Sequence, residues 1–199
     1  MGVSVAAKVE NYIKHRRMGE AITREQILCR VEGSEDALDQ AISRAAKANQ
    51  IQRIAPGLYA RPKKSRFGPL PPSQSSILKA LEAKHSAVIV PAGAKAVNEL
   101  GISTQLPMKQ VFVSNKRISE VQVGNQLITF KYRKALPEGV SKKVALLYSA
   151  LSYLGKHEAK QYYSQLELFI ATFSVKQNNQ LQEIAQGKLS WMATMIGRR

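Results

Sequence analysis

Four polar residues stand at helical spacing in one stretch of the chain, and their types suit contact with nucleic acid. Arg44 can donate two hydrogen bonds to the O6 and N7 edge of guanine, the commonest specific contact between a side chain and a base. Gln40 and Lys47 stand four and three positions from it, and Ser43 stands three positions from Gln40 and four from Lys47, so a helix would bring all four to one face. A merely solvated helix face is the alternative interpretation of the same pattern.

A second set of basic residues is better suited to phosphates, which fix the position of a protein on a duplex without reading its sequence. Tyr59 stands among them and is interpreted as a core residue, not as a ring that stacks on bases. Lys47 belongs to this set as well, and its other members are Arg53, Arg61, Lys63, Lys64 and Arg66.

Signs of catalysis are few. The chain carries no HExxH, CxxC or GxSxG motif, and His15, His85 and His157 are far apart in sequence. Carboxylates of the C-terminal part are isolated, whereas a two-metal nuclease or nucleotidyltransferase would need them in pairs to hold its cations. We therefore expect no enzyme, no catalytic residue, no metal and no cofactor.

The polar residues need a helix to position them, and the sequence predicts one with a clear start. Thr23 and Gln26 form a capping box for a short first helix, Gly33 gives a turn, and Ser34 caps the longer second helix. The apolar residues of this second helix recur at helical spacing and predict one buried stripe. They are Leu38, Ala41, Ile42 and Ala45.

A β-hairpin follows the two helices. Residues 51–54 alternate as a strand does, Pro56-Gly57 is a strong turn signal, and 58–61 return as a second strand. With a further helix predicted over 3–17, this is the element order of a winged helix-turn-helix, in which the hairpin is the wing.

The predicted fold class is α+β, with an N-terminal winged helix-turn-helix followed by a mixed α/β C-terminal domain that ends in three helices. We predict a DNA-binding domain over 1–62, a proline-rich basic linker over 63–72 and a C-terminal domain over 73–199. The last domain should begin with a helix capped by Ser73. Its other predicted elements are strands at 87–90 and 109–114, a short helix at 94–100, a hairpin over 121–134, and helices over 140–155, 159–173 and 176–196.

The charge of the chain favours a polyanionic partner. Lys and Arg number 30 against 14 acidic residues, which gives a net charge of +16 and a pI near 10.1. Residues 1–70 hold 13 basic and 7 acidic residues, and residues 71–199 hold 17 and 7, so the excess is not confined to the predicted DNA-binding domain.

Cysteine content and hydropathy predict the compartment. The single cysteine, Cys29, excludes a disulfide within the chain, and no run approaches the ~18 apolar residues of a membrane span. The N-terminus lacks the apolar core of a signal peptide. We expect a cytoplasmic protein without a membrane partner.

Two segments resemble the AbiEi-type antitoxins of bacterial toxin–antitoxin systems. These segments are PGLYARP at 56–62 and VIVPAGAKAVNELGISTQLP at 88–107, within a resemblance that spans about residues 5–135. In that family the winged helix binds operator DNA and represses its own operon, and the C-terminal domain is associated with neutralising a nucleotidyltransferase-like toxin. The strongest matches are Gly57, Tyr59, Pro62, Pro91, Gly93, Ala96, Asn98, Leu100, Gly101 and Pro107.

The resemblance implies a DNA-binding antitoxin whose partners are double-stranded operator DNA and a cognate toxin. Dimers or cooperative binding on inverted repeats are expected, and direct contact with the toxin is left open. Two alternatives remain from the residues alone: a freestanding winged-helix transcription regulator and a basic RNA-binding protein. The acidic start of the second helix, with Glu35, Asp36 and Asp39, moves the expected base contacts toward its C-terminal half.

Overall fold

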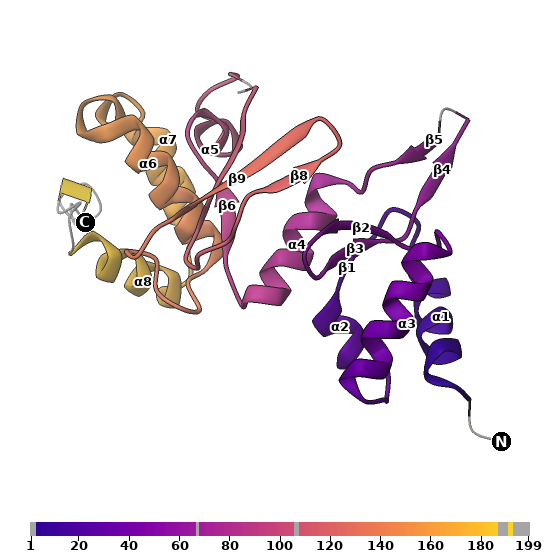
Figure 1. The fold of residues 1–199 in the computed structure, drawn as a ribbon. Coiled ribbons are helices and arrows are strands. Elements are labelled where there is room, and N and C mark those ends of the chain that lie inside the picture. The colour runs from indigo at the N-terminus through magenta and orange to yellow at the C-terminus, as the bar shows by residue number, and fades with distance from the viewer. Residues whose placement is uncertain (1–2, 67, 106–107, 187–190, 193–199) are drawn as a thin grey trace. The chain divides into compact units, whose positions relative to one another are not determined.

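Helices and strands alternate along the chain in an α+β fold, described here by a computed structural model of residues 3–66, 68–105, 108–186 and 191–192 (Figure 1). The α+β class predicted from the sequence is therefore confirmed. The chain forms two compact units. The first contains residues 1–86 and 121–127, and the second contains 87–120 and 128–199.

Three helices with defined N-terminal caps begin the first unit. α1 (Val5–Lys14) starts after Ser4, and α2 (Arg24–Leu28) starts with the predicted capping box of Thr23 and Gln26. In α3 (Glu35–Lys47) the Ser34 hydroxyl accepts a hydrogen bond from the Ala37 N–H. One apolar core joins the three helices, because each turns its hydrophobic stripe inward. Its buried residues are Val9, Ile13, Ile22, Ile27, Val31, Leu38, Ala41, Ile42, Ala45 and Ile51.

A three-stranded antiparallel sheet completes this core. The strands are β1 (Ala21–Thr23), β2 (Gln52–Ala55) and β3 (Leu58–Ala60), in the spatial order β1-β3-β2. The hairpin of β2 and β3 lies where the sequence predicted one. β1 was not predicted, because three residues are too few to show a strand period.

The prediction of a linker over 63–72 differs from the structure. β4 (Lys63–Ser65) and β5 (Gly68–Leu70) pair as an antiparallel hairpin, and Figure 1 shows it extending away from the helices of its unit. Proline had suggested irregular chain, but a two-stranded ribbon consists of edge strands, where proline is tolerated.

The division into compact units also differs from the predicted boundary. α4 (Gln74–His85), which starts at the predicted cap Ser73, belongs to the first unit, where the Ala21 N–H donates to the Ser76 hydroxyl at 2.7 Å. The boundary therefore lies after Ser86. Proline content marked the nearest breaks in regular structure, whereas a unit boundary depends on which elements pack together.

The second unit contains β6, β7 and most of β9 from a four-stranded sheet of order β6-β7-β9-β8, and β8 falls within residues 121–127 of the first unit. β7 runs antiparallel to β6 and parallel to β9. The bounds are β6 (Ile89–Pro91), α5 (Ala94–Glu99), β7 (Gln110–Ser114), β8 (Val121–Val123) and β9 (Gln126–Tyr132).

Three helices follow the sheet, as the sequence predicted. They are α6 (Lys142–Gln161), α7 (Tyr163–Ala171) and α8 (Val175–Ala185), and Gly155, the predicted end of the first, interrupts α6 with φ 70° and ψ 176°. Part of the predicted third helix, at 187–190 and 193–196, lies outside the described residues. Within the described part of the chain, no helix combines the length and apolar character that a membrane span requires.

Candidate nucleic-acid interface

The four polar residues that the sequence predicts to contact nucleic acid share the outer face of α3. Gln40, Ser43, Arg44 and Lys47 are all exposed, whereas the apolar stripe of the helix is buried. Arg44 Nη2 lies 3.5 Å from Gln40 Oε1, at the long limit of a hydrogen bond, so the guanidinium is held only weakly. The structure therefore brings these four side chains together on an accessible helix face.

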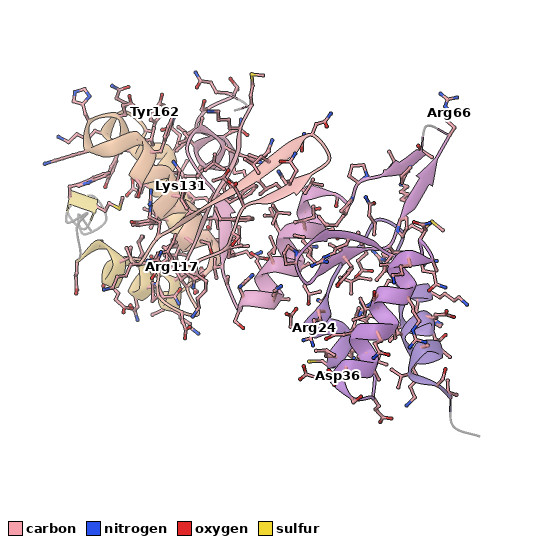
Figure 2. The ribbon with its side chains drawn as sticks, viewed as in Figure 1. Arg24, Asp36, Arg66, Arg117, Lys131 and Tyr162 are labelled. Atoms are coloured by element: carbon pink, nitrogen blue, oxygen red, sulfur yellow. The ribbon has the colours of Figure 1, made fainter. Side chains whose placement is uncertain are left out.

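The beginning of α3 is acidic, and an arginine from α2 binds it. Arg24 donates from Nε and Nη2 to the two carboxylate oxygens of Asp39, at 2.7 and 2.8 Å, and from Nη2 to Glu35 at 3.0 Å. The hydrogen bonds from Arg24 lower the pKa of Asp39 below its usual value, and the bond to Asp39 is the main cause that raises the pKa of Arg24. Figure 2 labels Arg24 and, on the same acidic turn, Asp36.

Arg24 was not among the residues that the sequence predicted for this face. It is the first residue of a capped helix, and nothing in its local sequence distinguishes it from a solvated surface cation. The sequence signal for its role is the acidic start of α3, because a nearby cation can form ion pairs with the three carboxylates there.

Arg53 lies on the edge strand β2 and is exposed. In the sheet register it stands opposite Tyr59 of β3, whose ring packs against the core of the unit, as expected from the sequence. Arg53 therefore remains accessible.

The turn of the predicted wing is held against its own unit. The carbonyl of Pro56 accepts a hydrogen bond from Lys84 Nζ at 3.1 Å, and the carbonyl of Gly57 accepts one from the Arg24 N–H at 2.9 Å. Gly57 has φ +68°, and a Cβ there would lie 2.7 Å from Lys84 Nζ. This turn is therefore short and tied down, and it projects little beyond the body of the unit.

Arg61 has a structural partner that its sequence context did not reveal. Its Nη1 donates to the carbonyl of Lys14 at 2.7 Å and to the carbonyl of Arg16. Lys14 is the last residue of α1, where no helical partner is available to its carbonyl, and Arg16 follows two positions later. This part of the guanidinium therefore caps a helix, and phosphate contact by Arg61 remains a prediction.

The β4–β5 hairpin carries the remaining basic residues of the predicted set. Lys63 and Arg66 are exposed, and Figure 2 shows Arg66 at the far end of the hairpin. The Ser65 hydroxyl donates to the Gly68 carbonyl at 2.8 Å across the turn. Lys64 lies in β4, and its side chain lies outside the described residues.

Ligating side chains are dispersed in the part of the chain that the structure describes. No group of three or more His, Cys, Asp or Glu residues there could hold a metal ion. Cys29 is exposed and unbridged.

These observations define an α+β chain whose first unit presents a polar helix face and a basic hairpin. The chain belongs to a family of unknown function, DUF6088, whose model matches residues 8–171. No curated protein matches the chain, and no solved structure does.

Proposed function

We propose that the first unit is a winged-helix DNA-binding module, and that the chain is a cytoplasmic antitoxin that represses its own operon. The proposal has two parts. The DNA-binding part is supported by the geometry of the first unit, and the antitoxin part by the resemblance in sequence.

The order of elements supports the winged-helix assignment. α1, β1, α2 and α3 are followed by the β2–β3 hairpin, and β1 pairs with β3 rather than with β2. This arrangement closes the sheet over the three-helix core and leaves α3 free on its outer side. A helix of this kind is the usual reader of the major groove in helix-turn-helix proteins.

The outer face of α3 is the observation that carries the proposal. Arg44 is exposed and only weakly held, so its guanidinium is available for the bidentate contact with guanine. Gln40 and Ser43 add hydrogen-bonding groups on the same face. The pairing of Arg24 with Asp39 reduces the repulsion that the acidic start of α3 would exert on phosphates.

Phosphate contacts are assigned to Lys47, Arg53 and the β4–β5 hairpin with Lys63, Lys64 and Arg66. The first unit holds 15 basic and 8 acidic residues, so its net charge favours a polyanion. We assign the role of the wing to the β4–β5 hairpin, because the Pro56–Gly57 turn between β2 and β3 is held against α4.

The antitoxin part rests on the segments at 56–62 and 88–107 that resemble AbiEi-type antitoxins. In the structure the second of these segments contributes β6 and α5 to the second unit. We therefore assign neutralisation of a nucleotidyltransferase-like toxin to that unit.

The experiment is titration of the full-length chain against labelled duplex DNA from upstream of its own operon, with random duplex as the comparison. Arg44→Ala should weaken operator binding by about 1–3 kcal/mol and leave random duplex nearly unaffected. Lys47→Ala and Arg53→Ala should weaken both duplexes alike. With roughly four to six phosphates neutralised, the log–log salt slope should lie near −4 to −5.

Lys156→Ala, an exposed cation of α6 in the second unit, is the matched control and should change neither affinity. Equal losses on operator and random duplex for Arg44→Ala would refute base reading by α3. Retention of operator binding by the Arg44→Ala, Lys47→Ala double variant would refute the whole assignment of DNA binding to this face.

A further inference from the structure

The second unit brings two strand ends together at one edge of its sheet. β7 and β9 are parallel neighbours, and their last residues, Ser114 and Tyr132, are partners in the register. The chain leaving β9 stays close to β7, because the Arg133 N–H donates to the Ser114 carbonyl at 2.8 Å. In open, mostly parallel sheets, ligands commonly bind outside the carboxyl ends of the strands, and β7 and β9 form a parallel pair in this mixed sheet.

Basic residues gather at this edge. Glu138 is bound by Lys116, which lowers the pKa of that carboxyl below its usual value. The other basic residues at the edge are Arg117, Lys131, Arg133 and Lys134. None of these four forms an ion pair within the described chain. An edge with so many uncompensated cations favours an anionic ligand.

An aromatic ring stands among these cations. Tyr132 is 39% exposed, and the guanidinium of Arg117 lies 5.1 Å from the centre of its ring. A planar cation beside an accessible ring is a surface on which a nucleic-acid base can stack. Bases inside a duplex have their faces covered by their neighbours, so such a surface suits unpaired bases.

The cations lie on both sides of the strand end. Tyr132 shares its register position with Ser114, whereas Lys131 shares its position with Val113, on the opposite face of the sheet. Figure 2 labels Arg117 and Lys131. A strand of nucleic acid that passes the edge would therefore meet positive charge along its path as well as the ring.

We propose that this edge of the second unit binds single-stranded nucleic acid, with phosphates on the basic side chains and a base stacked against Tyr132 and Arg117. The site is separate from the duplex-binding face proposed for α3 and does not depend on it. Its ligand class is an unpaired polynucleotide, which RNA and single-stranded DNA both supply.

The test uses the full-length chain and fluorescence anisotropy with labelled RNA and DNA single strands of about 12 nucleotides, within the range that one compact site covers. Tyr132→Ala should weaken binding about tenfold, since stacking of one base is lost. Tyr132→Phe should bind nearly as well as the unaltered chain, because the ring is kept. Tyr153→Ala, which removes an exposed tyrosine of α6, is the matched control and should have no effect.

Charge is tested by a second pair of variants. Arg133→Ala with Lys134→Ala should flatten the log–log salt slope by about 1.4, whereas Lys156→Ala with Lys160→Ala removes the same charge elsewhere and should leave the slope unchanged. Tighter binding of RNA than of DNA in the same series would identify the 2′-hydroxyl as part of the recognised group. Equal binding would limit recognition to phosphate and base.

Three results would overturn the proposal. The first is an equal loss for Tyr132→Ala and Tyr153→Ala. The second is loss of single-strand binding in the Arg44→Ala, Lys47→Ala variant but not in the Tyr132→Ala variant, which would place the contact on α3. The third is competition by polyglutamate as effective as that by unlabelled single strand, which would identify the edge as a docking surface for an acidic protein.

Discussion

Arg24, the first residue of α2, binds both carboxylate oxygens of Asp39 on α3, at 2.7 and 2.8 Å. The same guanidinium reaches Glu35 at 3.0 Å, so one cation compensates two acids at the start of the helix. The contact joins the two helices of the predicted helix-turn-helix. It also sets how much negative charge the outer face of α3 presents to a phosphate backbone.

Replacing Arg24 should therefore weaken duplex binding, although Arg24 itself is not assigned to DNA. We expect Arg24→Ala to reduce affinity for operator and random duplex alike, on the order of threefold, as an exposed charge pair typically would. Arg30→Ala removes the same charge from the chain that follows α2 and should have a smaller effect. Fluorescence anisotropy at low salt measures both, and equal affinities for the two variants would contradict the role given to Arg24.

The pKa of Asp39 provides a second test of the contact between Arg24 and Asp39. Because hydrogen bonds from Arg24 lower it, Arg24→Ala should return it toward the ordinary value of 3.8. An NMR titration of the side-chain carboxyl measures this directly. An unchanged pKa would mean that the ion pair does not persist in solution.

Arg61 should matter for stability more than for DNA binding. Its Nη1 caps the end of α1 through the carbonyls of Lys14 and Arg16, and hydrogen bonds from a charged donor contribute about 1.5–3 kcal/mol each. Arg61→Ala should therefore lower the free energy of unfolding by roughly this amount, measured by urea denaturation. Arg53→Ala, on the exposed edge strand, is the control and should be nearly neutral. A stable Arg61→Ala chain with a flatter salt slope on duplex DNA would instead assign the residue to phosphate.

Local sequence signals predicted much of the first unit. Thr23 with Gln26, Ser34 and Ser73 each cap the helix that was assigned to them, because a hydroxyl just before the first turn can accept a hydrogen bond from a free N–H of that turn. The exposed face of α3 followed from the same stripe. These features depend only on neighbours a few positions away, so they can be read without the tertiary structure.

Features that depend on distant partners were not predicted. The segment with Lys63 and Arg66 was interpreted as a linker from its prolines, whereas its pairing depends on which residues face each other across the turn. The role of Arg61 depends on carbonyls that lie 45 and 47 positions earlier in the chain. The edge with Arg117 and Tyr132 required the parallel register of β7 and β9, which no local pattern encodes.

Stability of the first unit should depend on the protonation of His85. Burial is the main cause that lowers the pKa of this imidazole below 6.5, and the neighbouring charge of Lys84 lowers it further, while Glu25 opposes both. The unfolded chain therefore takes up the proton first as the pH falls. The contribution of His85 to stability is fully present above pH 6.5 and is lost as the pH falls through the folded-state pKa.

Urea denaturation between about pH 5 and pH 8 tests this prediction, since the unfolding free energy follows the difference in bound protons. His85→Gln should remove part of the decline below pH 6.5. His157→Gln, on α6, is the control and should keep the decline. The same slope in both variants would show that other groups cause it.

Repression and toxin neutralisation should be separable by substitutions in the full-length chain. The Arg44→Ala, Lys47→Ala double variant alters only the exposed face of α3, so the second unit should fold and act as before. Co-expressed with the nucleotidyltransferase-like toxin that the proposal predicts, this variant should restore growth while a reporter fused to the operon promoter loses its repression. The unaltered chain should restore growth and repress the reporter. The Lys156→Ala, Lys160→Ala double variant should do the same. Loss of rescue in the α3 variant, with its thermal unfolding unchanged, would show that neutralisation needs the outer face of α3. If neither the variants nor the unaltered chain restores growth, a freestanding winged-helix regulator is the better account of the chain.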